Sequence, residues 1–168
     1  MIELAINLSI VGILAAIAIP GILGSIQRTG VDGASRRLAE DIRVAQSTAI
    51  TRGAQTRLLI FDRAGLVPEP TNLSETTKAN MYRIEIRNGP SASWPAIGDN
   101  PATNPNVLTV WNDLGFQYRG IAVTAGNAVV FNSQGFLGTS AMPLDIIVQG
   151  SGGTRTIRTS VIGKATVQ

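Results

Sequence analysis

The N-terminal stretch MIELAINLSIVGILAAIAIP places one carboxylate, Glu3, at the edge of an apolar run. Residues 4–26 contain no charged side chain. A helix of that length extends about 30 Å, which is enough to cross the hydrocarbon core of a bilayer. A carboxylate beside hydrocarbon is costly unless it is paired. The segment is therefore predicted to be a membrane-spanning helix, and Glu3 is predicted to need a cationic partner.

Two simpler roles compete for the apolar run. A cleaved secretory signal fits poorly, because such signals carry a basic segment before the apolar stretch, whereas Arg28 follows it here. A plain single-pass anchor explains the length of the run but gives no reason for Glu3.

The composition excludes most kinds of catalytic site. The chain has no cysteine and no histidine. Zinc, haem and iron–sulfur sites of the usual kinds, thiol nucleophiles and Ser-His-Asp catalysis are therefore excluded. The glycine cluster GSGG at 150–153 lacks the lysine and helix of a phosphate-binding loop, and it is predicted to be a turn between strands. The sequence predicts a protein that is not an enzyme and that carries no cofactor or metal.

An amphipathic segment follows the apolar run. Apolar side chains recur there at helical spacing, so they are predicted to share one buried face: Ala34, Leu38, Ile42, Ala45 and Ala49. Gly53 directly follows Arg52 and is predicted to end the helix. One long bent helix is expected from the start of the chain to about Arg52, with a kink near Pro20 and a second soft point at GVDG, residues 30–33.

Beyond Gly53 the apolar period changes to two, as in strands. In NMYRIEIRN at 80–88, three apolar residues alternate with charged ones, which predicts a half-buried strand. The other strand candidates are 56–62, 107–112, 127–132, 144–149 and 154–162. Residues 66–78 and 88–106 are rich in Pro, Asn, Ser and Gly and are predicted to be loops. The second loop is long enough to be functional or packed on itself.

Helix followed by sheet predicts an α+β fold. The predicted organisation is a hydrophobic transmembrane or filament-core helix segment at 1–26, an amphipathic helix segment at 27–53 and a β-rich globular head at 54–168. In this arrangement the amphipathic segment covers one face of an antiparallel sheet.

The N-terminus closely resembles the class III signal segment of type IV pilins and type II secretion pseudopilins. Ile2, Glu3, Leu4, Gly12 and the stretch 13–20 carry the resemblance. LAEDIRVAQSTAITRG at 38–53, VVFNSQGF at 129–136 and the terminal TIRTSVIGKATV are similar to the subgroup of minor pseudopilins and fimbrial-transport-like pilins. The resemblance implies a type IV pilin-like fold, with a long N-terminal helix packed on an antiparallel sheet.

The resemblance also implies a structural role. A subunit of this kind is cleaved and N-methylated by a prepilin peptidase and held in the inner membrane. The pilus assembly machinery then extrudes it into a helical homopolymer, a cell-surface type IV pilus with a role in cell adhesion. The alternative is a minor pseudopilin, either of a periplasmic type II secretion pseudopilus or of a DNA-uptake pilus.

Residue roles follow from the same resemblance. Glu3 would neutralise the N-terminal amine of a neighbouring subunit, at Met1, and so set the register of assembly. If Met1 is the mature end, this register differs from that of the family by two residues. Gly12 and Pro20 match positions where filament subunits lose helicity. The expected filament-core packing residues are Leu4, Ile10, Ile13, Leu14, Ile17 and Ile19.

DNA binding is a further alternative, because some minor pilins of this subgroup bind DNA through basic residues near the C-terminus. Arg155, Arg158 and Lys164 are the candidates here. Arg155 and Arg158 are three positions apart in a period-two element, so they are expected on opposite faces unless a bulge intervenes. Solvated strand charges are the simpler interpretation, and nucleic acid is not the expected partner.

Overall fold

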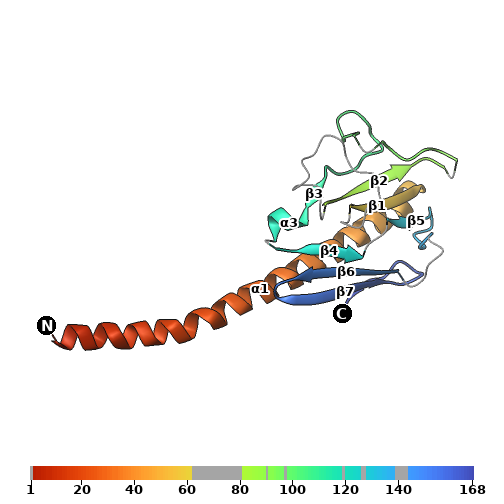
Figure 1. The fold of residues 1–168 in the computed structure, drawn as a ribbon. Coiled ribbons are helices and arrows are strands. Elements are labelled where there is room, and N and C mark those ends of the chain that lie inside the picture. Colours follow the sequence, from red (N-terminus) through yellow and green to blue (C-terminus); the bar gives the residue numbers. More distant parts are fainter. Residues whose placement is uncertain are drawn as a thin grey trace.

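A computed structural model of the chain describes residues 2–61, 81–89, 91–96, 98–118, 120–125, 128–138 and 144–168 (Figure 1). One long helix, α1 (Ile2–Arg52), leads into a head of two four-stranded antiparallel sheets. The first sheet has the order β3 (Asn112–Asp113), β2 (Met81–Arg87), β1 (Gln55–Phe61), β5 (Val129–Phe131). The second has the order β4 (Ala122–Ala125), β6 (Leu144–Gly150), β7 (Gly153–Thr159), β8 (Ala165–Val167). The predicted α+β fold is confirmed, with the strands divided between two sheets.

The second half of α1 forms the centre of the core. Among the described side chains of α1, Val31 is the first that is buried, at 1% exposure. The helix contacts strands of both sheets, and Figure 1 shows the head gathered around this half. The apolar face expected from the sequence is fully buried, with 0% exposure at each of Ala34, Leu38, Ile42, Ala45 and Ala49. The predicted amphipathic helix is therefore confirmed.

Gly53 ends α1, as predicted. Its φ of 59° lies in the left-handed region that glycine adopts without steric cost. The Gly53 amide donates to the Ile50 carbonyl at 3.3 Å, and the Ala54 amide donates to the Ala49 carbonyl at 3.2 Å. This pair of bonds is a Schellman motif, which satisfies carbonyls at the helix end.

The backbone of α1 is helical through Gly12, Pro20 and 30–33, and Figure 1 shows one continuous curved helix. Residues 30–33, where a second soft point is predicted, do not interrupt the helix. A Cβ atom added to Gly33 would lie 2.8 Å from Cε1 of Tyr118, so this glycine makes room for an aromatic ring. The loss of helicity expected at Gly12 and Pro20 concerns subunits in a filament and stays a prediction.

Strand β2 corrects the expectation of a half-buried strand, because its charged side chains are buried too. Arg83 and Glu85 are both 0% exposed. Arg83 donates to Glu85 and also to the backbone carbonyls of Ala96 and Asp99, each at 2.8 Å. Its guanidinium lies 4.5 Å from the centroid of the Trp111 ring. The long loop after β2 therefore packs onto the outer face of the sheet.

The strand expected at 107–112 is largely wrong. Val107 makes an isolated bridge to Glu85, the Leu108 amide donates to the Ile84 carbonyl at 2.9 Å, and regular strand pairing with β2 is found only at Asn112 and Asp113. The residues between them follow the edge of β2 without regular strand geometry, so only β3 is a strand. The other expected strands correspond to β1, β2, β5, β6 and β7, whereas β4, β8 and the short helix α3 (Leu114–Gln117) were not predicted.

Candidate assembly surface

Residues 2–30 of α1, called the arm below, project from the head (Figure 1). Three of the predicted filament-core residues are exposed along it: Ile10 at 50%, Ile13 at 62% and Leu14 at 61%. Val11, which was not singled out, is 63% exposed. The backbone is also helical at the remaining predicted filament-core residues and at the predicted helix-break residue Pro20, but their side chains lie outside the described residues: Leu4, Ile17, Ile19 and Pro20.

Exposed apolar side chains of the arm point in several directions, because successive residues of a helix turn by about 100°. A helix that is apolar on many sides is normally covered by other apolar groups. Large exposed apolar surfaces mark sites of interaction with proteins or membranes. Among the described residues, no helix has both the length and the hydropathy of a membrane-spanning segment.

Glu3 is exposed in the first turn of α1, where the helix dipole favours a negative charge. It makes no ion pair with any residue that the structure describes. The next charged residue along the chain is Arg28, about 37 Å further along a straight helix. A cationic partner for Glu3 within this helix is therefore out of reach, while Met1 lies outside the described residues.

A polar contact in the core fixes α1 against the first sheet and thereby sets the direction of the arm. Tyr82 on β2 is 1% exposed, and its hydroxyl donates to the Asp41 carboxylate on α1. Arg37 lies 3.2 Å from the same carboxylate. Burial, and secondly the hydrogen bond to Asp41, raise the pKa of the Tyr82 hydroxyl above its ordinary value. Tyr82 thus stays neutral and holds helix and sheet together.

Comparison with known proteins identifies the family of this chain and a solved structure of similar fold. Residues 34–163 match the family described as Type II transport protein GspH. The chain belongs to the GspH family. It is thus a pilin or pseudopilin, a class of structural subunits of type IV pilus-like or type II secretion filaments.

A solved structure supports the fold assignment for this GspH-family chain. The crystal structure of the type IV minor pilin FimU from Pseudomonas aeruginosa (strain PAO1) superposes with a TM-score of 0.52 at 16% identity. The match covers 84% of this chain and 90% of that chain. At this identity the likeness shows the fold alone, and it confirms the type IV pilin-like architecture. A comparison with curated proteins gave no match.

The basic residues considered for DNA binding lie apart on the GspH-family head. Arg155 is directed at α1, where its Nε lies 2.7 Å from Asp32. Arg158 lies on the other face of β7 and donates twice to Asp145, each time at 2.8 Å. The two arginines therefore occupy opposite faces, as the spacing predicted. Lys164 is exposed beyond β7, so the structure does not gather the three residues into one basic surface.

The GSGG segment is a turn between β6 and β7, as predicted. Gly150 pairs with Gly153, whose φ is 127°. A Cβ atom on Gly152 would lie 2.3 Å from the carbonyl carbon of Gln27. The turn thus packs directly against the backbone at the base of the arm.

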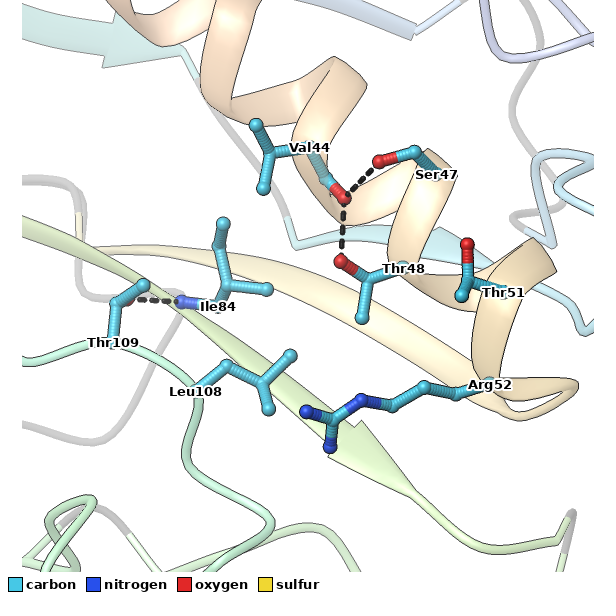
Figure 2. Close-up of a pocket in the computed structure, with 8 residues that line it drawn as sticks. All are labelled: Val44, Ser47, Thr48, Thr51, Arg52, Ile84, Leu108 and Thr109. Atoms are coloured by element: carbon cyan, nitrogen blue, oxygen red, sulfur yellow. Dashed lines mark hydrogen bonds between the residues drawn. The ribbon is translucent and has the colours of Figure 1, made fainter.

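A pocket of about 340 Å³ lies between the last turns of α1 and the segment that crosses the edge of β2 (Figure 2). The sequence does not predict this pocket, because its walls come from segments far apart in the chain. Its one sequence signal is Arg52, which the helix pattern explained as a C-terminal cation. The lining residues are Val44, Ser47, Thr48, Thr51, Arg52, Ile84, Leu108 and Thr109.

Proposed function

We propose that this chain is a filament subunit that assembles by packing its arm against the arms of neighbouring subunits. The observation that carries the proposal is an exposed apolar helix whose first turn holds Glu3, a carboxylate without an ion pair among the described residues. Burying an aliphatic side chain stabilises by roughly 1.5–3 kcal/mol. The four exposed residues at 10–14 would therefore contribute on the order of 6–12 kcal/mol before the costs of association.

Glu3 sets the register of this packing. An apolar helix bundle has many nearly equivalent longitudinal alignments, whereas a buried carboxylate is tolerated only opposite a cation. The N-terminal amine of the adjacent subunit supplies that cation. The loss of helicity at Gly12 and Pro20 then adjusts the arm to its neighbours as it enters the filament.

Before assembly, the arm lies in the inner membrane, where lipid covers the same apolar side chains. The apolar run at 4–26 and the resemblance of residues 2–20 to the pilin signal segment support this location. A prepilin peptidase cleaves and N-methylates the precursor, and the assembly machinery extracts the subunit from the membrane.

Within the filament, the chain occupies a minor position rather than forming the bulk of the shaft. The resemblance of residues 38–53 and 129–136 to the subgroup of minor pseudopilins favours this assignment. The description of the family as type II transport proteins supports a periplasmic secretion pseudopilus as the alternative setting.

Replacement of Glu3 tests the proposal. Glu3→Ala should leave membrane insertion unchanged and reduce incorporation into filaments by at least about tenfold, because an unpaired buried amine costs several kcal/mol. The measurement is the ratio of the chain in sheared filaments to the chain in membranes, by quantitative immunoblot. Glu40→Ala, which removes an exposed carboxylate from the same helix within the head, serves as the matched control. Wild-type incorporation of the Glu3→Ala chain would contradict the register role.

A further inference from the structure

The pocket in Figure 2 has an apolar floor and a cationic rim. Ile84 on β2, which is 2% exposed, and Leu108 form the floor, and Val44 on α1 forms one wall. Arg52 extends from the last turn of α1 across the pocket towards Leu108 (Figure 2). The pocket therefore offers an apolar surface and a guanidinium group side by side.

The hydrogen-bonding groups of the pocket include unused donors. The hydroxyls of Ser47 and Thr48 both donate to the Val44 carbonyl, at 3.0 and 2.7 Å. Thr109 accepts from the Ile84 amide at 2.9 Å through its hydroxyl oxygen, so its own proton is available. Among the described residues, Thr51 has no hydrogen-bond partner for its hydroxyl and Arg52 has no ion pair.

The charge of the pocket selects for an anion. None of the described residues that line it is acidic. The carbonyls of Ala49 and Ile50 near the helix end, which would repel an anion, already accept from Ala54 and Gly53. Arginine binds carboxylates through two parallel hydrogen bonds, which makes a carboxylate the best-matched group.

We propose that this pocket is a docking socket for a neighbouring filament subunit, which inserts an acidic side chain together with an adjacent aliphatic side chain. This inference rests on the proposed function, because it requires neighbouring subunits. The charge complementarity of Arg52 specifies the acid, and the floor of Ile84 and Leu108 specifies the aliphatic group. A volume of about 340 Å³ is at the small end for ligand pockets, which suits side chains better than an extended ligand.

A filament gives such a socket a natural occupant. Head-to-tail contacts in a helical assembly join unlike patches on successive subunits, so a socket on one head meets a different surface on the next. Arginine is enriched among the residues that dominate binding energy at protein interfaces. The socket would then fix the orientation of the head while the arm supplies most of the buried apolar area.

Photocrosslinking of the full chain in cells tests the inference. A p-benzoylphenylalanine residue replaces Thr51 in the socket or, in a second variant, Ile13 in the arm. The Thr51 probe should crosslink to a neighbouring subunit, at a peptide with Asp or Glu within two positions of an aliphatic residue, as identified by mass spectrometry. Adding Arg52→Glu should lower this crosslink about tenfold and leave the Ile13 crosslinks unchanged, because an interaction of about 1.4 kcal/mol corresponds to a factor of ten. In the Arg52→Glu background, replacing the identified acidic residue of the neighbouring subunit by a basic one should restore the Thr51 crosslink.

Lys164→Glu, an equal charge reversal at another exposed cation of the head, is the matched control and should leave the Thr51 crosslink unchanged. The socket is contradicted if the Thr51 crosslink is insensitive to Arg52→Glu, or if the probe reaches only its own chain or a small molecule, while the Ile13 crosslinks persist. Absence of Ile13 crosslinks from the otherwise unaltered chain would instead contradict the proposed function, and the socket with it.

Discussion

At the scale of single residues, the charges of β2 show what periodicity predicts and what it leaves out. The alternation of apolar and charged residues identified the strand and its inward face correctly, because Tyr82, Ile84 and Ile86 are all buried. It also assigned Arg83 and Glu85 to solvent, since charged side chains are seldom fully buried. Their burial depends on a loop that returns over the sheet and accepts hydrogen bonds from Arg83. Nothing in the local pattern encodes that contact.

The buried ion pair is expected to be essential for stability. Glu85→Ala would remove the buried carboxylate that pairs with both Arg83 and Arg57, which should cost about 3–5 kcal/mol in the free energy of unfolding. Urea denaturation of the full chain in detergent measures this loss. Asp145→Ala removes an exposed carboxylate paired with Arg158 and should change stability little, because solvent screens that pair. If Glu85→Ala and Asp145→Ala lowered the free energy of unfolding equally, the buried ion pair would be no more important for stability than the exposed one.

Tyr82 predicts a specific dependence of stability on alkaline pH. The pKa of its hydroxyl is raised in the folded state above the ordinary value of 10.0. The stabilisation is therefore complete below about pH 10 and is lost as the pH rises above it, because the unfolded chain ionises first. Tyr82→Phe should lower stability near pH 8 by about 1.5–3 kcal/mol, the worth of a hydrogen bond to a charged group, and flatten the fall above pH 10. Urea titrations from pH 8 to 11 measure both effects, with Tyr118→Phe as control. If the free energy of unfolding of Tyr82→Phe falls as steeply above pH 10 as that of the wild type, ionisation of Tyr82 is not the cause of the pH dependence.

At the scale of elements, strongly periodic segments were predicted well and short ones were not. The helix, its buried face and its end at Gly53 follow from spacing and from glycine chemistry. β4 and β8 have only four and three residues, too few to show a period, and each is a strand because β6 or β7 lies beside it. The predicted strand at 154–162 ends early, since residues 160–163 turn with Gly163 at a φ of 81°. Pairing with neighbouring strands in the fold determines where β4, β7 and β8 begin and end, and a local sequence pattern does not show this pairing.

The β6–β7 turn should tolerate no side chain where it meets α1. Gly152→Ala would place Cβ 2.3 Å from helix backbone at Gln27, and overpacking of this kind costs about 1–3 kcal/mol. Gly30→Ala is the opposing control, because a Cβ there meets nothing within 4 Å and alanine is favoured in a helix by up to about 1 kcal/mol. Thermal unfolding of the full chain should give a lower Tm for Gly152→Ala and a higher or equal Tm for Gly30→Ala. A stable Gly152→Ala chain would show that the turn can move away from the helix.

At the scale of the whole molecule, the chain combines a head built around the second half of α1 with a projecting arm on which several described apolar side chains are exposed. The head buries one face of α1 between two sheets and belongs to the GspH family over residues 34–163. The arm lies outside that match, so its proposed role in assembly rests on its sequence and on the exposure of its apolar side chains. The sequence predicted an apolar helix in the arm, because Glu3 is followed by a long run without charged residues. It did not predict the Arg52 pocket, because only the fold brings the end of α1 beside residues 108 and 109.

The proposed role of the arm is to enter a filament built from neighbouring subunits. Electron microscopy of filaments sheared from cells that express the chain, with immunogold labelling and mass spectrometry of the same material, tests it most directly. We predict that the chain is present in the filaments in small proportion, and that Glu3→Ala removes it from them. Filaments that lack the chain altogether, while the chain remains abundant and unassembled in the membrane fraction, would contradict this role of the arm.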